Sequence, residues 1–231
     1  MKRQIIGLMG AKGAGKDTAA AFLCKELGFV RLAFAQRLYE EVAEAFGVTV
    51  AFLGDRTVVQ TAQGPVERKE LPQAELALRN CSDPAFVACV LEELKQQNVD
   101  MATPLSPREV MQQWGTEYRR RRGVDSYWLD IVQAQLDAEP EQNFVITDVR
   151  FPNEHSFVLE FEGLLFRIRN LQVEAREAAN RAQNGTSGHS SETALNDAMA
   201  HAEIFNEQGN LAKLRADTLA AARAQDLVAL S

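Results

Sequence analysis

The chain has 231 residues, enough for one α/β domain with insertions or for two small domains. Its hydrophobic fraction of 46% and charged fraction of 25% are ordinary for a globular protein, and the net charge of −7 argues against stable nucleic-acid binding. No apolar run is long enough to span a membrane, no signal peptide is recognisable, and three cysteines without metal-ligand spacing favour a reduced, cytoplasmic protein.

The first elements predicted along the chain are a buried strand and a loop that binds phosphate. Residues 5–9 are mainly apolar, which is typical of a parallel strand covered on both faces. Three glycines then let the backbone bend and turn its N–H groups inward, and a lysine follows that can reach the β- and γ-phosphates of a nucleotide. The residues predicted to form this nucleotide-binding loop are Gly10, Ala11, Lys12, Gly13, Ala14, Gly15, Lys16, Asp17 and Thr18.

One position of the loop is unusual. The residue after Lys16 is expected to be Ser or Thr, whose hydroxyl meets Mg²⁺, but here it is Asp17, with Thr18 next. Two interpretations of Asp17 stay open: it caps the following helix, or it holds a metal-bound water.

The rest of the chain alternates helices with strands. A helix is predicted over Lys16–Leu27, with Gly28 as its left-handed cap. Ser106, Pro107 and Glu109 give a helix cap, a first-turn proline and a capping box, so a helix is expected from there to about Arg122. The other predicted helices are 35–46, pieces near 74–80 and 84–97, 126–136, a polar helix within 171–192, and 211–228; the other predicted strands are 29–34, 144–147, 164–168 and 202–205.

Five short strands alternating with helices predict a parallel sheet with right-handed crossovers. With the phosphate loop, this indicates an α/β fold of the P-loop NTPase class: a three-layer α/β/α domain over 1–231 with a five-stranded sheet. The stretch between the second and third strands is too long for a crossover alone. We therefore predict a helical insertion at 36–142 that covers a second substrate, and a lid at 170–192.

Two residues after the strand at 144–147 are predicted to act on phosphates. Asp148 follows the carboxyl end of that strand, where a carboxylate can hold Mg²⁺ through water; the alternative is that it only caps the next turn. The guanidinium of Arg150 could bridge donor and acceptor phosphates, and its alternative is a salt bridge with Glu154.

A second candidate surface lies on the helix that begins at Ser106. Arg108, Gln112, Gly115 and Arg119 recur at helical spacing and should share one face, which suggests a phosphate clamp, an amide that reads a base edge, and room for a nucleotide ring. Trp114 could stack on the base or lie in the core. Arg119 begins a run of four arginines, and of these four only Arg119 is assigned a catalytic role.

The polar segment at 170–192 is predicted to close over the transferred phosphate and exclude water. Its candidate phosphate ligands are Arg169, just before the segment, and Arg176 and Arg181 within it, with a merely solubilising role as the alternative.

Several motifs, in order along nearly the whole chain, resemble the deoxynucleoside monophosphate kinases of tailed bacteriophages. They are Gly-Ala-Lys-Gly-Ala-Gly-Lys-Asp-Thr (10–18), Phe-Ala (34–35), Ser-Pro-Arg-Glu-Val-Met-Gln-Gln-Trp-Gly-Thr-Glu (106–117), Thr-Asp-Val-Arg-Phe-Pro-Asn-Glu (147–154), His-Ser-Ser-Glu (189–192) and Ile-Phe-Asn-Glu-Gln-Gly-Asn-Leu (204–211). The resemblance implies phosphoryl transfer from ATP, with Mg²⁺, to a deoxynucleoside monophosphate in the cytoplasm, that of the host if a phage encodes the chain. It also implies that Thr18 bonds the α-phosphate.

The resemblance extends the set of residues expected at the substrate. That set is Phe34, Arg37, Arg108, Gln112, Trp114, Arg119, Arg150, Glu154, Arg169, His189 and Glu192. The chain departs from the family pattern at 36–39, where Arg37 stands in for an expected lysine. Two other functions stay open: a kinase of another small metabolite such as dephospho-coenzyme A, and an ATP-binding protein without turnover. A homodimer is one candidate for the oligomeric state.

Overall fold

The computed structural model describes residues 3–184, 195, 197–207 and 210–228. The chain divides into two units, one made of Met1–Phe34 and Val132–Ser231 and the other of Ala35–Ile131. The second lies within the insertion predicted at 36–142 except for its first residue.

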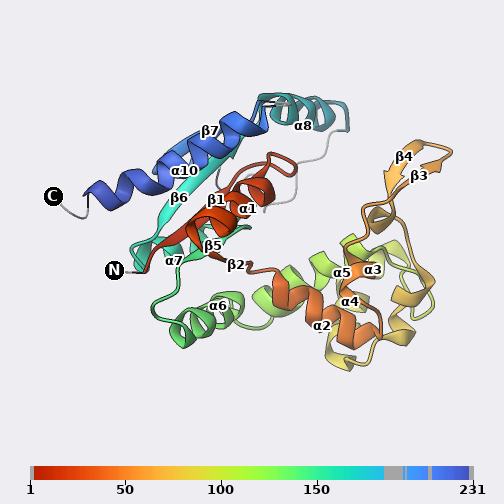
Figure 1. Cartoon of the computed structure of the whole chain (residues 1–231). Helices are drawn as coiled ribbons and strands as arrows, with labels where there is room; N and C mark the ends of the chain where they lie inside the picture. The colour runs from red at the N-terminus through yellow and green to blue at the C-terminus, as the bar shows by residue number, and fades with distance from the viewer. Residues whose placement is uncertain (1–2, 185–194, 196, 208–209, 229–231) are drawn as a thin grey trace. The chain divides into compact units, whose positions relative to one another are not determined.

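The first unit is built on a five-stranded parallel sheet, as predicted (Figure 1). In spatial order its strands are β2 (Val30–Leu32), β5 (Phe144–Ile146), β1 (Ile5–Met9), β6 (Leu164–Arg169) and β7 (Ala202–Phe205). The central strand β1 is buried along its whole length, which explains its unbroken apolar sequence. Because parallel strands end at the same edge, the loops after β1 and β5 start side by side.

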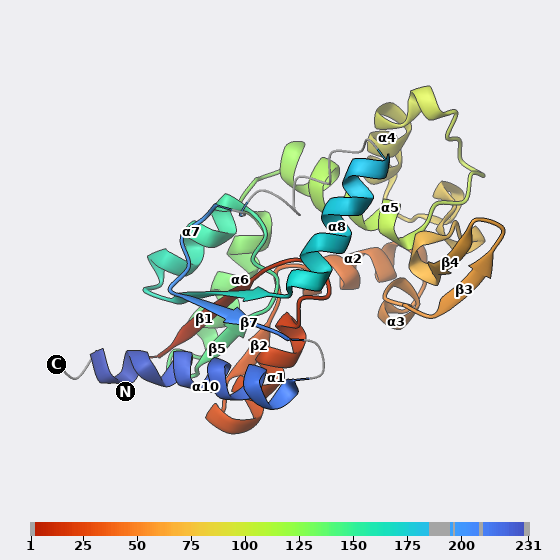
Figure 2. The same cartoon turned by 90° about the horizontal axis from the view of Figure 1, so that it is seen from above.

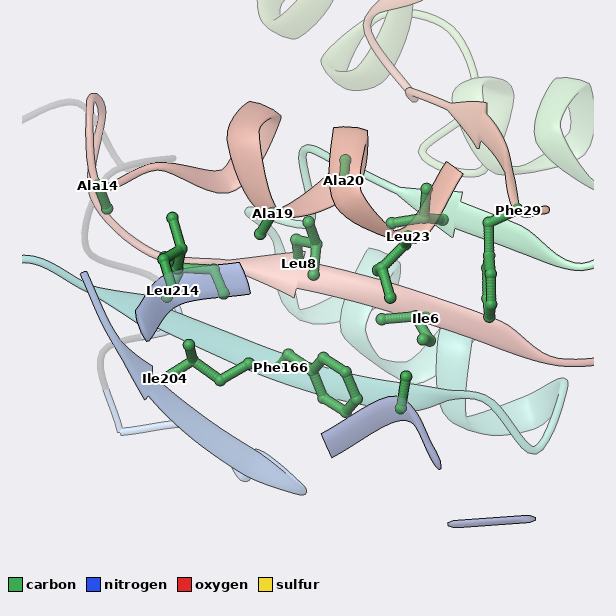
Figure 3. Close-up of a cluster of buried hydrophobic side chains, with 13 residues drawn as sticks. Ile6, Leu8, Ala14, Ala19, Ala20, Leu23, Phe29, Phe166, Ile204 and Leu214 are labelled. Carbon is green, nitrogen blue, oxygen red and sulfur yellow. The ribbon is translucent and has the colours of Figure 1, made fainter. Parts of the chain in front are cut away.

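Helices cover both faces of this sheet. Helices α1 (Lys16–Leu27) and α10 (Leu211–Val228) pack together on one face, where the cluster in Figure 3 includes Ile6, Leu8 and Leu214. Helix α7 (Pro152–Glu160) packs against β1 and β6 from the other face, and its Val158 side chain meets the position of Gly7. The unit is therefore the predicted three-layer α/β/α sandwich, although α7 itself was not predicted.

The remaining helices of the first unit agree closely with the sequence. The bounds predicted for α1 and α10 are confirmed, and Gly28 ends α1 with φ 70°. Helix α6 (Tyr127–Ala138) crosses the boundary between the two units, and α8 (Leu171–Asn184) follows β6. None of the described helices has an apolar stretch that could cross a membrane.

The second unit is mostly helical (Figure 2). It contains α2 (Gln36–Phe46), α3 (Val50–Leu53), an antiparallel hairpin of β3 (Val58–Thr61) and β4 (Gly64–Glu67), η1 (Arg68–Glu70), η2 (Ala74–Leu76), η3 (Leu78–Asn80), α4 (Pro84–Glu93), η4 (Lys95–Gln97), α5 (Pro107–Gln112) and the π-helix η5 (Gln113–Arg121).

Three predictions for this unit need correction. The helical piece expected near 74–80 is two separate 3₁₀ turns, and the α-helix expected over 84–97 ends at Glu93. The helix from Ser106 begins with the predicted capping box but continues as a π-helix after Gln112. The hairpin at 58–67 was not predicted.

Candidate active site

The loop after β1 has the backbone geometry of a phosphate cradle. Gly10, Gly13 and Gly15 have φ of 134°, 81° and 109°, a region that residues with side chains rarely adopt. A Cβ at Gly10 would overlap the carbonyl oxygen of Ile168, and one at Gly15 would lie 2.5 Å from Nδ2 of Asn206. In the described part of the chain, nothing lies within 4 Å of a Cβ at Gly13. The loop thus has fixed ends and an open middle, which suits the oxygens of a polyphosphate.

Lys16 bridges the loop. Its Nζ donates hydrogen bonds to the carbonyl oxygens of Gly10 (2.7 Å) and Ala11 (2.8 Å) at the N-terminus of α1. Charged phosphate oxygens accept stronger hydrogen bonds than neutral carbonyl oxygens do. The ammonium is therefore already held where an incoming phosphate can compete for it.

Asn206, which follows β7, braces the same loop. Its Nδ2 donates to the carbonyl oxygen of Ala14 (2.8 Å), and its backbone N–H donates to the carbonyl oxygen of Arg169 (2.7 Å). The loop after β1 is therefore tied to the ends of β6 and β7. Asn206 belongs to the motif at 204–211, which by itself predicts no role for this residue.

Asp17 does not cap α1. The N-cap residue is Gly15, without a side-chain hydrogen bond, and the Asp17 carboxylate instead pairs with the guanidinium of Arg31 on β2. Because both side chains are more than half exposed, this pair is a surface interaction. The capping interpretation is therefore wrong, while a role at a metal-bound water stays a prediction. Thr18 is half-buried in the first turn of α1.

Asp148 lies at the same sheet edge, at the end of β5. It is 9% exposed, and its Oδ1 accepts a hydrogen bond from the backbone N–H of Phe34 (2.8 Å). The side chain of Phe34 is 4% exposed and packs edge-on against Phe157, with ring centroids 5.7 Å apart. The ring of Phe34 therefore belongs to the core, and the predicted contact of Phe34 with substrate stays a prediction.

Glu154 holds the backbone that carries Arg150. It is 2% exposed, and its Oε2 accepts hydrogen bonds from the backbone N–H groups of Arg150 (2.7 Å) and Phe151 (3.1 Å) at the start of α7. Its assignment to substrate is wrong for this reason. Arg150 itself is exposed, and its guanidinium has no ion-pair partner among the residues that the structure describes, so the alternative of a salt bridge with Glu154 is also wrong.

The start of the predicted lid is held by an ion pair. Arg169 donates from Nε and Nη2 to the two carboxylate oxygens of Glu174 (3.1 and 2.7 Å), and its guanidinium lies over the Phe205 ring at 5.6 Å. These hydrogen bonds lower the pKa of Glu174. Arg176 is exposed on α8. His189, Glu192 and the side chain of Arg181 lie outside the described residues.

In the second unit, Trp114 is a core residue. It is 2% exposed, packs on Phe86 with ring centroids 4.5 Å apart, and donates from Nε1 to Glu41 on α2 (2.8 Å). Of the two alternatives for Trp114, the structure shows the core position, because its ring packs on Phe86 and its polar edge bonds Glu41. Arg119 also bonds Glu41, through Nε at 2.9 Å.

Arg108 is separated from Gly115 and Arg119, although these are three of the four residues expected on one helical face. Arg108 pairs with Glu70 (3.2 Å), whereas Gly115 and Arg119 face α2, where a Cβ at Gly115 would lie 3.0 Å from Leu38 Cδ2. The space left by Gly115 is therefore filled by Leu38, not by a nucleotide ring. The change from α- to π-helix after Gln112 explains the separation, because it alters the residue period.

Two other predicted substrate residues are accessible. Gln112 is half-buried. Arg37 on α2 is 45% exposed and pairs with Glu40 (3.3 Å). Both remain available to a ligand of this unit.

A search of curated proteins identifies the family. The deoxynucleoside-5'-monophosphate kinase of Escherichia phage T5 is 30% identical to the chain over 183 residues, which cover 69% of this chain and 73% of that protein. The chain belongs to the deoxynucleoside monophosphate kinases. A protein of Acanthamoeba polyphaga mimivirus, provisionally named a deoxynucleotide monophosphate kinase, is also 30% identical, over 71% of the kinase and 72% of its own length.

Solved structures give more distant matches. A Thermus thermophilus protein covers 97% of the kinase and 98% of its own chain, at 17% identity and a TM-score of 0.45. An unliganded sugar kinase from Janibacter sp. HTCC2649 covers 96% and 95%, at 12% identity and a TM-score of 0.42. No family model matches the chain. The family assignment therefore rests on the two sequence relatives.

Asp148 offers one carboxylate that could take part in binding a magnesium ion. Within the described residues, no group of three or more His, Cys, Asp or Glu side chains could hold a metal ion. Mg²⁺ keeps several waters and is typically bound by one or two carboxylates together with substrate phosphates. The buried carboxylate of Asp148 at the edge of the phosphate loop meets that requirement.

Sequence reasoning missed two residues that hold candidate site residues in place, Glu41 and Asn206. Glu41 is 7% exposed and receives hydrogen bonds from two aromatic side chains and an arginine. Its position in an amphipathic helix gave no signal, because acidic residues on helices are usually solvated. For Asn206, the only available signal was its place in the motif at 204–211.

Proposed function

We propose that this kinase transfers the γ-phosphoryl group of ATP to a deoxynucleoside monophosphate, giving ADP and a deoxynucleoside diphosphate. The observation that carries the proposal is the glycine cradle with Lys16 across it, in a chain related to named deoxynucleoside monophosphate kinases. We place the reaction in the cytoplasm, in keeping with free thiols at Cys24, Cys81 and Cys89.

The first unit binds the donor in this proposal. The backbone N–H groups of residues 10–18 surround the phosphates, and Lys16 exchanges its two carbonyl acceptors for β- and γ-phosphate oxygens. Thr18 bonds the α-phosphate. Asp148, fixed by the backbone of Phe34, would hold Mg²⁺ through water, and Asp17 would orient a second water of the ion. When bound, Mg²⁺ neutralises the charge that develops on the phosphates.

Two groups of arginines act on the moving phosphoryl group. Arg150 is exposed on a backbone that Glu154 holds rigidly, so its guanidinium can neutralise charge between donor and acceptor. Arg169 lies just before the segment at 170–192 and Arg176 lies within it, and we propose that this segment excludes water when it closes. Exclusion of water prevents hydrolysis of ATP in place of transfer.

The second unit binds the acceptor. Arg119 holds its phosphate, Arg108 and Arg37 add positive charge, and Gln112 reads a base edge. We thus assign the insertion at 36–142 to binding of the monophosphate. With a net charge of −7, the kinase has no stable nucleic-acid partner, and a homodimer remains a candidate assembly.

The test is a panel of deoxynucleoside and ribonucleoside monophosphates, with dephospho-coenzyme A as a further acceptor, incubated with ATP and Mg²⁺ while ADP is measured. ADP should form only with a deoxynucleoside monophosphate, and chelation of Mg²⁺ should stop it. Lys16→Met should lower kcat by about 10²–10³-fold, the usual effect of removing one donor to developing charge. Lys25→Met, an exposed lysine of the same helix, is the control and should retain activity. Transfer to dephospho-coenzyme A alone, or ATP binding without any transfer, would refute the proposal.

A further inference from the structure

Glu41 is a buried carboxylate at the centre of a side-chain cluster in the second unit. It is 7% exposed, and it accepts hydrogen bonds from Trp114 Nε1 (2.8 Å), Arg119 Nε (2.9 Å) and the Tyr127 hydroxyl. A fourth group, Nε of Arg37, lies 3.7 Å away. Burial of a carboxylate costs several kcal/mol unless it is paired and hydrogen-bonded, and here it is both. An apolar side chain would fill the same place at less cost, so the charge calls for an explanation beyond packing.

The cluster immobilises Arg119 at one end only. Glu41 engages Nε, and the rings of Tyr118, Tyr127 and Trp114 lie 4.8, 4.9 and 5.4 Å from the guanidinium carbon. Among the described residues, neither terminal nitrogen of Arg119 has a hydrogen-bond partner, and 26% of the side chain is exposed. A guanidinium fixed in this way presents the fork that binds phosphate oxygens in pairs.

The π-helix makes this arrangement possible. Trp114 and Arg119 are five residues apart, and on an α-helix of 3.6 residues per turn their side chains would point about 140° apart. In a π-helix the backbone bonds join residues five apart, so both side chains can reach one carboxylate. Local π-helices are frequent at functional sites, which agrees with a purpose for this one.

We propose that Glu41 is a positioning residue that holds Arg119 with its two terminal nitrogens ready for the phosphate of the acceptor monophosphate. The inference rests on the proposed function, because it assigns the acceptor to the second unit. Glu41 touches neither nucleotide and acts chiefly through Arg119, which it contacts at 2.9 Å, whereas Nε of Arg37 lies 3.7 Å away. Loss of the Glu41 charge should therefore weaken acceptor binding without affecting the donor.

The experiment compares steady-state kinetics of the wild type, Glu41→Gln, Arg119→Gln and the double variant. Glu41→Gln keeps the shape of the side chain and one oxygen that can receive a hydrogen bond. Because one charge-assisted hydrogen bond is lost, we expect the KM of the monophosphate to rise about tenfold, while the KM of ATP changes less than about twofold. Arg119→Gln should raise the acceptor KM further. Adding Glu41→Gln to Arg119→Gln should then change little, because the positioned group is already gone.

A second buried site separates positioning from general stability. Leu76→Ala, at a fully buried leucine of the same unit, should lower the melting temperature but leave the acceptor KM unchanged. If Glu41→Gln does not fold, Arg119→Lys provides the test instead. Lysine retains the charge but lacks the planar guanidinium that Glu41 holds, so we expect an acceptor KM as high as that of Arg119→Gln.

The inference and the proposed function can fail separately. Additive effects in the double variant, an unchanged acceptor KM in Glu41→Gln, or full activity in Arg119→Lys would overturn the role of Glu41 while the wild type still transfers phosphate. Absence of transfer in the wild type would instead overturn the proposed function.

Discussion

One end of the phosphate loop and its middle should respond differently to the same substitution. Gly10 and Gly13 both have positive φ, so alanine at either position costs about 1–2 kcal/mol of backbone strain. At Gly10 the added Cβ would also overlap the carbonyl oxygen of Ile168 and lie 3.2 Å from its carbonyl carbon. Ile168 cannot retreat easily, because its strand pairs with β7 at Ile204. Overpacking of this kind lowers the stability by about a further 1–3 kcal/mol, as it does in protein cores.

The stability difference can be measured by calorimetry. In a chain of this size, 1 kcal/mol shifts the melting temperature by about 2–4 °C. We therefore expect Gly13→Ala to lower the melting temperature by about 5 °C and Gly10→Ala to lower it by about 10 °C. Equal shifts in the two variants would refute the reasoning, since the difference depends only on the overlap with Ile168.

Gly13→Ala should weaken ATP binding strongly, although it lowers the stability less than Gly10→Ala does. The Cβ of Gly13→Ala enters the open middle of the loop, where the phosphates are proposed to lie. The dissociation constant of Gly13→Ala for ATP should rise at least about tenfold, which corresponds to a loss of about 1.4 kcal/mol of binding free energy. Titration calorimetry at a temperature where both variants are folded checks this. Wild-type affinity in Gly13→Ala would show that the phosphates bind elsewhere.

Two further predictions concern Asp148 and Glu174. Asp148→Asn keeps an oxygen that can accept a hydrogen bond from the Phe34 N–H, so the melting temperature should change little. Because the substitution removes the charge, kcat with Mg²⁺ should fall about 100-fold. Retained activity would argue against a role of Asp148 in metal binding. Hydrogen bonds from Arg169 lower the pKa of Glu174 below its ordinary 4.5, so this pair stabilises the folded state above about pH 4.5 and loses that effect as the pH falls. The unfolding free energy of the wild type should exceed that of Glu174→Gln at neutral pH by less than about 1 kcal/mol, and the difference should vanish in acid.

Local signals explain the parts of the fold that the sequence predicts well. An unbroken apolar run gives β1, and glycines in the left-handed conformation end α1 and α2 at Gly28 and Gly47. The loop of residues 10–18 is equally local, because its glycines and its lysine are neighbours in the chain. These features need no knowledge of distant residues.

The side-chain roles that were wrong depend on distant partners. The residues that donate to Glu41 lie 73, 78 and 86 positions away, so nothing near Glu41 marks it as buried. Trp114 was ambiguous for the same reason, because its choice between core and base depends on Phe86 and Glu41. The π-helix over Gln113–Arg121 was not predicted, because its sequence reads as a continuation of the α-helix that ends at Gln112.

The motif at 147–154 shows why site residues read from a motif need two measurements. Two of its carboxylates, Asp148 and Glu154, accept hydrogen bonds from backbone N–H groups, whereas Arg150 between them has an exposed side chain. Substitution of Glu154 would release the backbone of Arg150 and so lower both stability and activity, but substitution of Arg150 would remove only an exposed guanidinium. A loss of activity with an unchanged melting temperature therefore identifies a residue that acts on the phosphates, and a joint loss identifies one that holds the backbone in place.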